Sequence, residues 1–230
     1  TMHKRNNSMN INMSGNFAFN ELVDRKIKLE TAKKYGVKSI LNSEGEIEKH
    51  AYPYYINQEV ATFKIREVKD KGFAWTKPTN GVGLFGEQLF KSGQKYVTLF
   101  EGECDAMAGY ELMGSQWASL SVKSGATGGV KDVQENLEYI ESFENVIICF
   151  DNDKKGIEGA YKVAKLLTPG KVKICKLPNG FKDPNEMLRQ GRHSSFMESW
   201  WSAKTYTPDG VLNVTDKLND YKNRPKKVSI

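Results

Sequence analysis

Two carboxylate-bearing stretches stand directly after short apolar runs. Glu101 follows YVTLF, and Asp151 follows VIICF, with Asp153 two residues further on. Side chains two residues apart point to the same side of an extended chain, so Asp151 and Asp153 would face one way. Acids that meet at one sheet edge repel each other, and a hard divalent cation with oxygen ligands, Mg²⁺ or Mn²⁺, relieves that repulsion. Each acid alone is better explained as a helix cap, as for Asp153 before KKGIEGA, but the two sites together favour metal binding.

The elements that must position these acids alternate between strand and helix. Strand-like and helix-like runs follow one another in the order 94–102, 103–114, 117–122, 130–143, 145–151, 155–167 and 170–178. Short apolar strands with helical connections are typical of a parallel sheet that is buried on both faces. Ligands of such sheets bind at the carboxyl ends of the strands, which is where Glu101 and Asp151 lie.

The first part of the chain has a different pattern of expected secondary structure. Residues 19–35 have helical spacing and end on Gly36, a residue typical of helix C-termini. Residues 37–76 read as several short strands, so we expect a small α+β unit ahead of the parallel sheet. The turns and short helices that we expect elsewhere are at 43–45, 70–72, 185–191 and 194–203.

The composition limits the class of protein. The 230 residues are enough for a proper core, and the net charge of +6 favours a polyanion partner, with a merely basic surface as the alternative. There is no run of about 18 apolar residues and no apolar core of a secretory signal, so we expect no membrane contact. Cys104, Cys149 and Cys175 lie far apart, which argues against a zinc ribbon and a disulfide framework. We expect a reducing compartment and a cytoplasmic location.

The acidic motifs lead to a known family. Residues 95–190 resemble a TOPRIM domain, the module of bacterial primases, topoisomerases and some nucleases, through FEGECD and FDNDKKG. About residues 20–215 are similar to the primase half of phage bifunctional primase-helicases, which are related to the bacterial DnaG-type primases. The stretches that carry this likeness are EGECDAMAGYEL, DNDKKG, GKVKICKLP and KDPNEML, preceded by TAKKYGVKSI, YPYY, KIREVKDKGF and GLFGEQLF.

The resemblance implies an α/β fold, a TOPRIM domain with a central, mostly parallel sheet flanked by helices, preceded by a small α+β subdomain. It divides the chain into five parts. These are a disordered or cloning-derived start, an N-terminal primase subdomain, the TOPRIM catalytic domain, a helical extension and a basic linker towards a missing helicase domain, at 1–18, 19–94, 95–192, 193–215 and 216–230.

The resemblance also implies a reaction, template-directed synthesis of RNA primers on single-stranded DNA from ribonucleoside triphosphates. Two ions, Mg²⁺ or Mn²⁺, would be held by Glu101, Asp151 and Asp153, with no zinc in this chain. Asp183 is expected beside the metal site as a further catalytic residue. Asp105 lies one helical turn after Glu101, where a supporting role beside the metal and a favourable charge at the helix N-terminus are equally good explanations.

Basic residues precede the parallel sheet. Lys64, Arg66, Lys69 and Lys71 lie within eight residues, and a strand would put Lys64 and Arg66 on one face, towards nucleotide phosphates or template. A solvated strand edge guarded by lysines is the alternative, but the matching stretch of phage primases carries functional lysines, which favours Lys64 and Lys71 as triphosphate contacts. The glycine-rich SVKSGATGG adds backbone amides and Lys123 as phosphate contacts, or is a loop without ligands.

Other functions and residues complete the expectations. A TOPRIM nuclease that uses the same metals is one alternative, and a non-catalytic module that binds single-stranded DNA is another. A hexameric helicase domain is the expected partner in the full-length chain. Trp75 is the one tryptophan expected to contact nucleic acid, one of Trp200 and Trp201 is expected to face inwards, and Glu103 is expected to face solvent.

Overall fold

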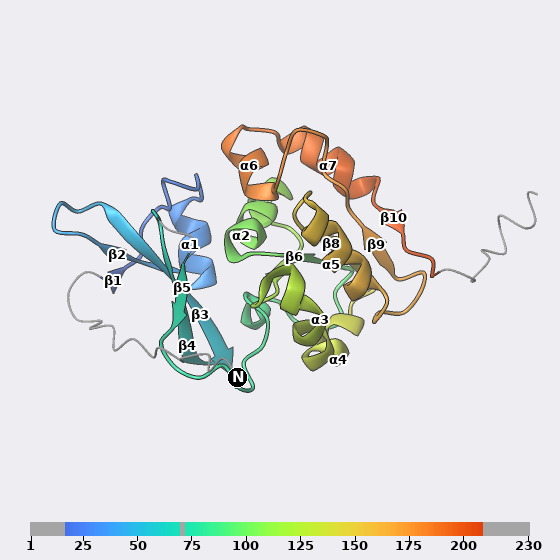
Figure 1. The fold of residues 1–230 in the computed structure, drawn as a ribbon, viewed down its shortest axis with the longest axis horizontal. Coiled ribbons are helices and arrows are strands. Elements are labelled where there is room, and N and C mark those ends of the chain that lie inside the picture. Colours follow the sequence, from blue (N-terminus) through green and yellow to red (C-terminus); the bar gives the residue numbers. More distant parts are fainter. Residues whose placement is uncertain (1–16, 70–71, 209–230) are drawn as a thin grey trace, which may run out of the picture.

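The computed structural model describes residues 17–69 and 72–208 of the chain. Within these residues the strands form two five-stranded sheets, which Figure 1 shows side by side. The first sheet lies in the N-terminal part and the second in the C-terminal part. The change of sequence pattern near residue 94 therefore falls between the last strand of the first sheet and the first strand of the second.

The first sheet is antiparallel throughout and follows chain order, β1-β2-β3-β4-β5. A tight turn at Asn57 and Gln58 joins its two long strands, and both residues have positive φ, 50° and 69°, as the twist of a hairpin requires. The elements are β1 (Phe17–Ala18), α1 (Leu29–Tyr35), β2 (Lys38–Leu41), β3 (Ile47–Ile56), β4 (Glu59–Glu67) and β5 (Phe73–Trp75).

The helix expected over residues 19–35 is shorter than its pattern suggests. Leu22 and Ile27, both fully buried, exchange backbone hydrogen bonds across a turn, and Lys26 in that turn has a φ of 52°. Burial of these two side chains in the turn therefore overrides the local helical spacing, and α1 begins only at Leu29. Gly36 ends the helix with a φ of 73°, as expected.

The second sheet has the order β10-β9-β8-β6-β7, in which β9, β8, β6 and β7 are parallel and β10 is antiparallel at the edge. This confirms the expected mostly parallel sheet. Its elements and the 3-10 turn before it are η1 (Glu87–Leu89), β6 (Tyr96–Phe100), α2 (Glu103–Leu112), β7 (Ala118–Ser121), α3 (Gly125–Glu135), α4 (Leu137–Glu141), β8 (Asn145–Cys149), α5 (Lys154–Ala164), β9 (Val172–Ile174), α6 (Pro184–Arg189), α7 (His193–Trp201) and β10 (Lys204–Thr205).

Two details of this half differ from the expectations. The helix predicted at 130–143 begins at Gly125 and breaks at Asn136, because the glycine-rich segment itself forms the first turns of α3. The expected helical extension after residue 192 contains α7, but the chain then returns to the sheet as β10. The expected linker at 216–230 and residues 1–16 of the expected start at 1–18 lie outside the described residues, whereas Phe17 and Ala18 of that start are ordered as β1, paired with β2.

Helices cover both faces of the second sheet (Figure 1). One core holds buried side chains of α2, α6 and α7 together with those of the first sheet, for example Met107, Phe196 and Tyr52. The other core packs α3 and α5 on the opposite face. The Tyr35 hydroxyl on α1 donates to the Ser119 carbonyl on β7 at 2.8 Å, so a buried hydrogen bond also joins the N-terminal part to the second sheet. No helix in the described ranges is both long and apolar enough to cross a membrane.

Candidate active site

The acids predicted from the sequence meet at the carboxyl ends of two neighbouring strands. In the parallel pair of β6 and β8, Phe100 lies opposite Cys149, so Glu101 and Asp151 emerge at the same edge. The backbone N–H of Asp151 donates to Glu101 Oε2 at 3.3 Å. The expected convergence of the two motifs is therefore present in the fold.

A cavity of about 570 Å³ opens beside these acids, between the first sheet and the second. Its walls combine carboxylates of the second sheet with cations that come largely from the first. The lining residues are Arg25, Lys64, Arg66, Val68, Lys69, Phe73, Glu101, Gly102, Glu103, Cys104, Asp105, Lys123, Ser124, Gly125, Asp151, Lys182 and Asp183.

Three carboxylates in this cavity, Glu101, Asp105 and Asp151, have raised pKa values. Burial, followed by the charge of Asp151, raises the pKa of Glu101. Burial and the neighbouring Asp183 raise the pKa of Asp105 well above its ordinary value. Burial also raises the pKa of Asp151, although Lys182 Nζ lies 3.0 Å from its Oδ2 and opposes the shift. Burial and the nearness of other acids therefore both disfavour the charged forms of these three carboxylates.

Two of the acids are also helix caps, which was the alternative explanation for Asp153. Its Oδ1 accepts from the Gly156 N–H at 2.9 Å and so begins α5. Asp183 Oδ1 likewise accepts from the Glu186 N–H at 2.7 Å and begins α6. Asp153 is exposed, yet its charge still raises the pKa of Glu101. Capping uses one oxygen of each carboxylate and leaves the other available.

The acids of this cavity supply the oxygen donors of a magnesium site, but they are not grouped closely around one point. Among the residues that the structure describes, no three His, Cys, Asp or Glu side chains are grouped to hold a metal ion. The oxygen donors of Glu101 and Asp151 nevertheless suit a hard cation, and burial together with neighbouring acids raises the pKa of both. At present the mostly exposed ammonium of Lys182 supplies positive charge to Asp151. The residues therefore fit a divalent cation as donors.

Asp105 faces the same cavity and also holds a neighbouring element. Its Oδ1 accepts from the backbone N–H of Asn185 at 3.1 Å, which ties α2 to the start of α6. It stands in the first turn of α2, so both explanations offered by the sequence describe part of its environment.

The basic residues predicted to contact nucleotide line the opposite wall. Lys64, Arg66 and Lys69 all lie on the cavity, and the strand β4 puts Lys64 and Arg66 on one face as expected. Lys64 is buried, Arg66 is half-buried and Lys69 is exposed. Lys71 lies outside the described residues.

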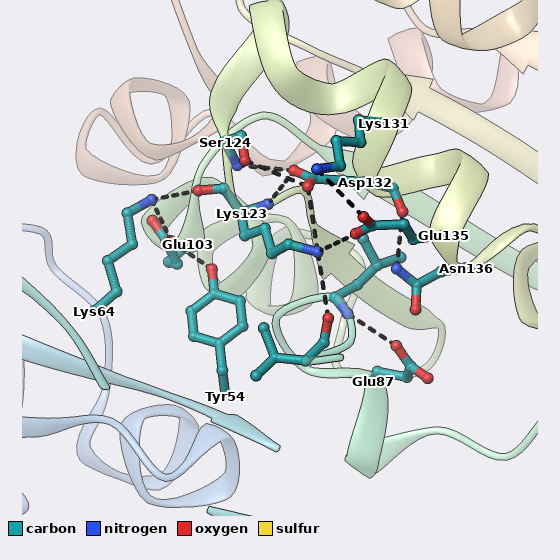
Figure 2. Close-up of polar contacts among 12 residues, drawn as sticks. Tyr54, Lys64, Glu87, Glu103, Lys123, Ser124, Lys131, Asp132, Glu135 and Asn136 are labelled. Atoms are coloured by element: carbon teal, nitrogen blue, oxygen red, sulfur yellow. Dashed lines mark hydrogen bonds and ion pairs between the residues drawn. The ribbon is translucent and has the colours of Figure 1, made fainter. Parts of the chain in front are cut away.

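Glu103, expected to face solvent, is instead 2% exposed. That expectation was wrong because Glu103 is an internal partner for the first sheet. Its Oε1 accepts from Lys64 Nζ and from the Tyr54 hydroxyl, each at 2.7 Å (Figure 2). Lys64 Nζ donates a second bond to the Lys123 carbonyl at 2.9 Å. These are its two hydrogen-bond acceptors within residues 17–69 and 72–208, and an ammonium has three donors, so the third N–H can serve a ligand in the cavity.

Lys123 uses its ammonium differently. Its Nζ lies 3.3 Å from the Val82 carbonyl, 2.9 Å from Glu135 Oε2 and 3.3 Å from Asp132 Oδ1 (Figure 2). Three protein acceptors occupy its three donors, and the residue is 7% exposed. In this structure the Lys123 ammonium is not available to a phosphate, because its charge is matched inside the protein.

The sequence reasoning missed two cations of this cavity. Arg25 lies in the turn that was expected to be helical, and Lys182 precedes Asp183 in a motif of which only the acid was singled out. Nearby acids, Asp151 first among its causes, raise the pKa of Lys182. A basic residue directly before a capping Asp was the available signal for Lys182.

The aromatic ring that lines the cavity is Phe73, whereas Trp75 was the tryptophan predicted to contact nucleic acid. Trp75 is half-buried and packs edge-on against Tyr54, with ring centroids 4.9 Å apart. Phe73 is the more exposed ring on the cavity, at 56%, and Lys64 Nζ lies 4.7 Å from its centroid. Of the tryptophan pair on α7, Trp200 is buried and Trp201 is exposed, as expected.

Comparison with known proteins agrees with this fold. Residues 98–188 match the family described as Toprim-like. A DNA helicase/primase of Enterobacteria phage T3 is 34% identical over 167 residues, which are 71% of this chain and 29% of that protein. The chain thus spans less than a third of this relative's length.

Two solved structures from bacteriophage T7 are also similar. The primase fragment of the phage T7 primase-helicase is 30% identical, with a TM-score of 0.72 over 80% of this chain and 75% of the fragment. A chain of a T7 lagging-strand polymerase assembly, described with primase domains bound to an RNA/DNA hybrid and dTTP, is 29% identical. Its TM-score is 0.75 over 85% of this chain and 97% of that one.

The fold and the matched residues define a TOPRIM domain preceded by a small α+β subdomain. The chain belongs to the family of TOPRIM-containing primase domains of phage primase-helicases.

Proposed function

We propose that this chain is the catalytic core of a DNA primase, which synthesises short RNA primers on single-stranded DNA. The observation that carries the proposal is the division of one cavity into an acidic wall, with Glu101 and Asp151, and a basic wall on β4. Such a cavity can hold a nucleoside triphosphate between groups that bind metal and groups that bind phosphate.

Glu101, Asp151 and Asp153 are the proposed ligands of two divalent cations, Mg²⁺ or Mn²⁺. Bound ions of this kind neutralise charge on the phosphates and favour ionisation of a 3′-hydroxyl. The raised pKa values of Glu101 and Asp151 support the assignment, because burial and then neighbouring acids disfavour their charged forms, which a bound cation would favour. Asp105 and Asp183 accept hydrogen bonds from backbone N–H groups at the start of α6 and so fix that helix beside the metal-binding acids. Asp183 is also a proposed catalytic residue.

The basic wall is proposed to hold the incoming nucleotide. The third N–H of Lys64 and the forked guanidinium of Arg66 suit phosphate oxygens, and Lys69 extends the positive wall towards the template. Lys71, which lies outside the described residues, is proposed as a further nucleotide contact. Lys123 enters the proposal through its backbone, which borders the cavity, rather than through its ammonium. In the reaction the 3′-hydroxyl oxygen bonds to the α-phosphorus, the bond to pyrophosphate breaks, and pyrophosphate leaves with its charge balanced by this wall.

The proposed partners follow from the same reasoning. The T7 assembly is described with an RNA/DNA hybrid and dTTP, and we infer single-stranded DNA and ribonucleoside triphosphates for this chain. The T3 relative is a helicase/primase, so we propose that a hexameric helicase domain accompanies this core. A cytoplasmic site of action in a bacterial host is part of the proposal and is consistent with three free, buried cysteines.

One experiment separates this function from a TOPRIM nuclease and from a binding module without catalysis. The chain is incubated with single-stranded DNA, ribonucleoside triphosphates and Mg²⁺, and with a supplied dinucleotide that removes the need for initiation. Labelled oligoribonucleotides support the proposal, and shortened DNA would support the nuclease. Retention of DNA on a filter with neither product would support the binding module.

A further inference from the structure

We propose that Asp132 is a positioning residue that holds the turn at 123–126 against the metal-binding carboxylate Glu101. The inference rests on the proposed function, because it concerns the same acidic wall. It assigns a role to a residue that is not itself on the cavity and that the sequence reasoning did not single out.

The turn approaches Glu101 closely. Gly125, with a φ of 66°, lies beside the Glu101 carboxylate: a Cβ placed on it would be in van der Waals contact with Oε1, at 3.8 Å. The backbone of the next residue, Ala126, interacts with the same carboxylate and opposes the rise of its pKa. The position of Glu101 therefore depends on the position of this turn.

Asp132 fixes the turn from inside the protein. It stands on α3 and is 2% exposed. Its Oδ2 accepts from the backbone N–H groups of Lys123 and of Ser124, each at 2.9 Å, and its Oδ1 accepts from Ser124 Oγ at 3.3 Å (Figure 2). A buried carboxylate that accepts bonds from two successive amides defines the path of the backbone there.

The same turn is held from the other side by the N-terminal subdomain. Lys64 Nζ donates to the Lys123 carbonyl at 2.9 Å (Figure 2). One residue of the turn thus has its N–H fixed by Asp132 and its C=O fixed by β4. The ion pair between Asp132 and Lys123 Nζ, at 3.3 Å, balances the buried charge.

These contacts form a continuous path from the nucleotide-binding wall to the metal-binding wall. It runs from Lys64 through the Lys123 carbonyl and the turn to Ala126 and Glu101. Asp132 does not line the cavity itself, and it acts only through Lys123 and Ser124 of the turn, which do. Loss of its bonds would leave the fold of the sheet in place but would loosen the carboxylate at the metal site.

Binding of Mn²⁺ alone tests this inference without measuring catalysis. The free Mn²⁺ signal is followed by electron paramagnetic resonance with wild type, Asp132→Ala, Asp132→Asn and the control Glu135→Gln. Glu135 is exposed and contacts the Lys123 ammonium in the same network, whereas the described amides of Lys123 and Ser124 donate to Asp132 and not to Glu135. We expect Asp132→Ala to weaken Mn²⁺ binding about tenfold, Asp132→Asn to weaken it less, and Glu135→Gln to match wild type.

The outcomes distinguish this inference from the proposed function. If Asp132→Ala is folded and binds Mn²⁺ as tightly as Glu135→Gln does, the positioning role is refuted. If Asp132→Ala does not fold, the comparison of Asp132→Asn with Glu135→Gln decides in the same way. Glu101→Gln is run in parallel: weak binding by Glu101→Gln with normal binding by the Asp132 variants refutes only the positioning role. Normal binding by Glu101→Gln refutes both.

Discussion

The buried ion pair between Lys64 and Glu103 gives a quantitative prediction for Glu103→Gln. The two charged atoms are 2.7 Å apart, and the side chains are 10% and 2% exposed. Removing one partner of such a pair leaves an unmatched buried charge, which costs about 3–5 kcal/mol of unfolding free energy. Lys64 keeps the Lys123 carbonyl and the Phe73 ring, so we expect the lower end, about 3 kcal/mol. For a chain of this size that corresponds to a fall in Tm of about 6–12 °C.

Urea unfolding followed by tryptophan fluorescence measures this effect. Glu138→Gln, an exposed acid on α4, is the matched control and should change the unfolding free energy by less than about 0.5 kcal/mol. The double variant Lys64→Met with Glu103→Gln should recover most of the loss, because it buries neither charge. A loss below about 1 kcal/mol for Glu103→Gln, or a double variant as unstable as the sum of its singles, would refute the reasoning.

Three further predictions concern the acidic wall. Asp105→Asn should raise the Tm of the metal-free protein at pH 7.5, because the charged Asp105 carboxylate destabilises the folded state, in which its pKa is raised. That destabilisation is lost as the pH falls through the folded pKa towards the unfolded one, so the gain in Tm should shrink in acid. A gain in Tm that is independent of pH would contradict this reasoning. Mg²⁺ at about 100 times its Kd should stabilise the wild-type protein by about 2.7 kcal/mol in a thermal shift assay. Asp151→Asn should gain clearly less from Mg²⁺, and equal gains would show that Asp151 is not a ligand of the metal. Gly156→Ala should lower the unfolding free energy by about 1–3 kcal/mol, because its Cβ would lie 2.2 Å from the Asp151 carbonyl, whereas Gly72→Ala, which meets open space, should have little effect in the same urea titration.

Sequence periodicity predicted the second sheet well because its strands are buried on both faces. Runs such as YVTLF and VIICF have a single physical explanation in a chain that alternates with helices, and the acids after them had to meet once the strands were parallel neighbours. The Gly36 cap was equally predictable, since a positive φ at a helix end favours glycine. Local rules therefore sufficed where local pattern and burial agreed.

The differences arose where distant contacts decided the structure. Residues 22–27 have helical spacing but turn back, because Leu22 and Ile27 are both needed in the core. Glu103 looks like an exposed first-turn acid until Lys64 and Tyr54 of the first sheet are placed against it. Lys123 looks like a free phosphate ligand until Asp132 and Glu135 are seen around it. None of these pairings has a sequence signal, since each joins elements whose docking is fixed only in three dimensions.

The most direct test of the account is extension of a supplied dinucleotide on single-stranded DNA by Glu101→Gln, with Glu138→Gln as the exposed control. Both changes remove one carboxylate charge, but only Glu101 lies at the end of β6 beside Asp151. The account predicts that Glu138→Gln extends the dinucleotide at the wild-type rate and that extension by Glu101→Gln falls at least about a hundredfold. Undiminished extension by folded Glu101→Gln would contradict the assignment of this cavity as the site of primer synthesis.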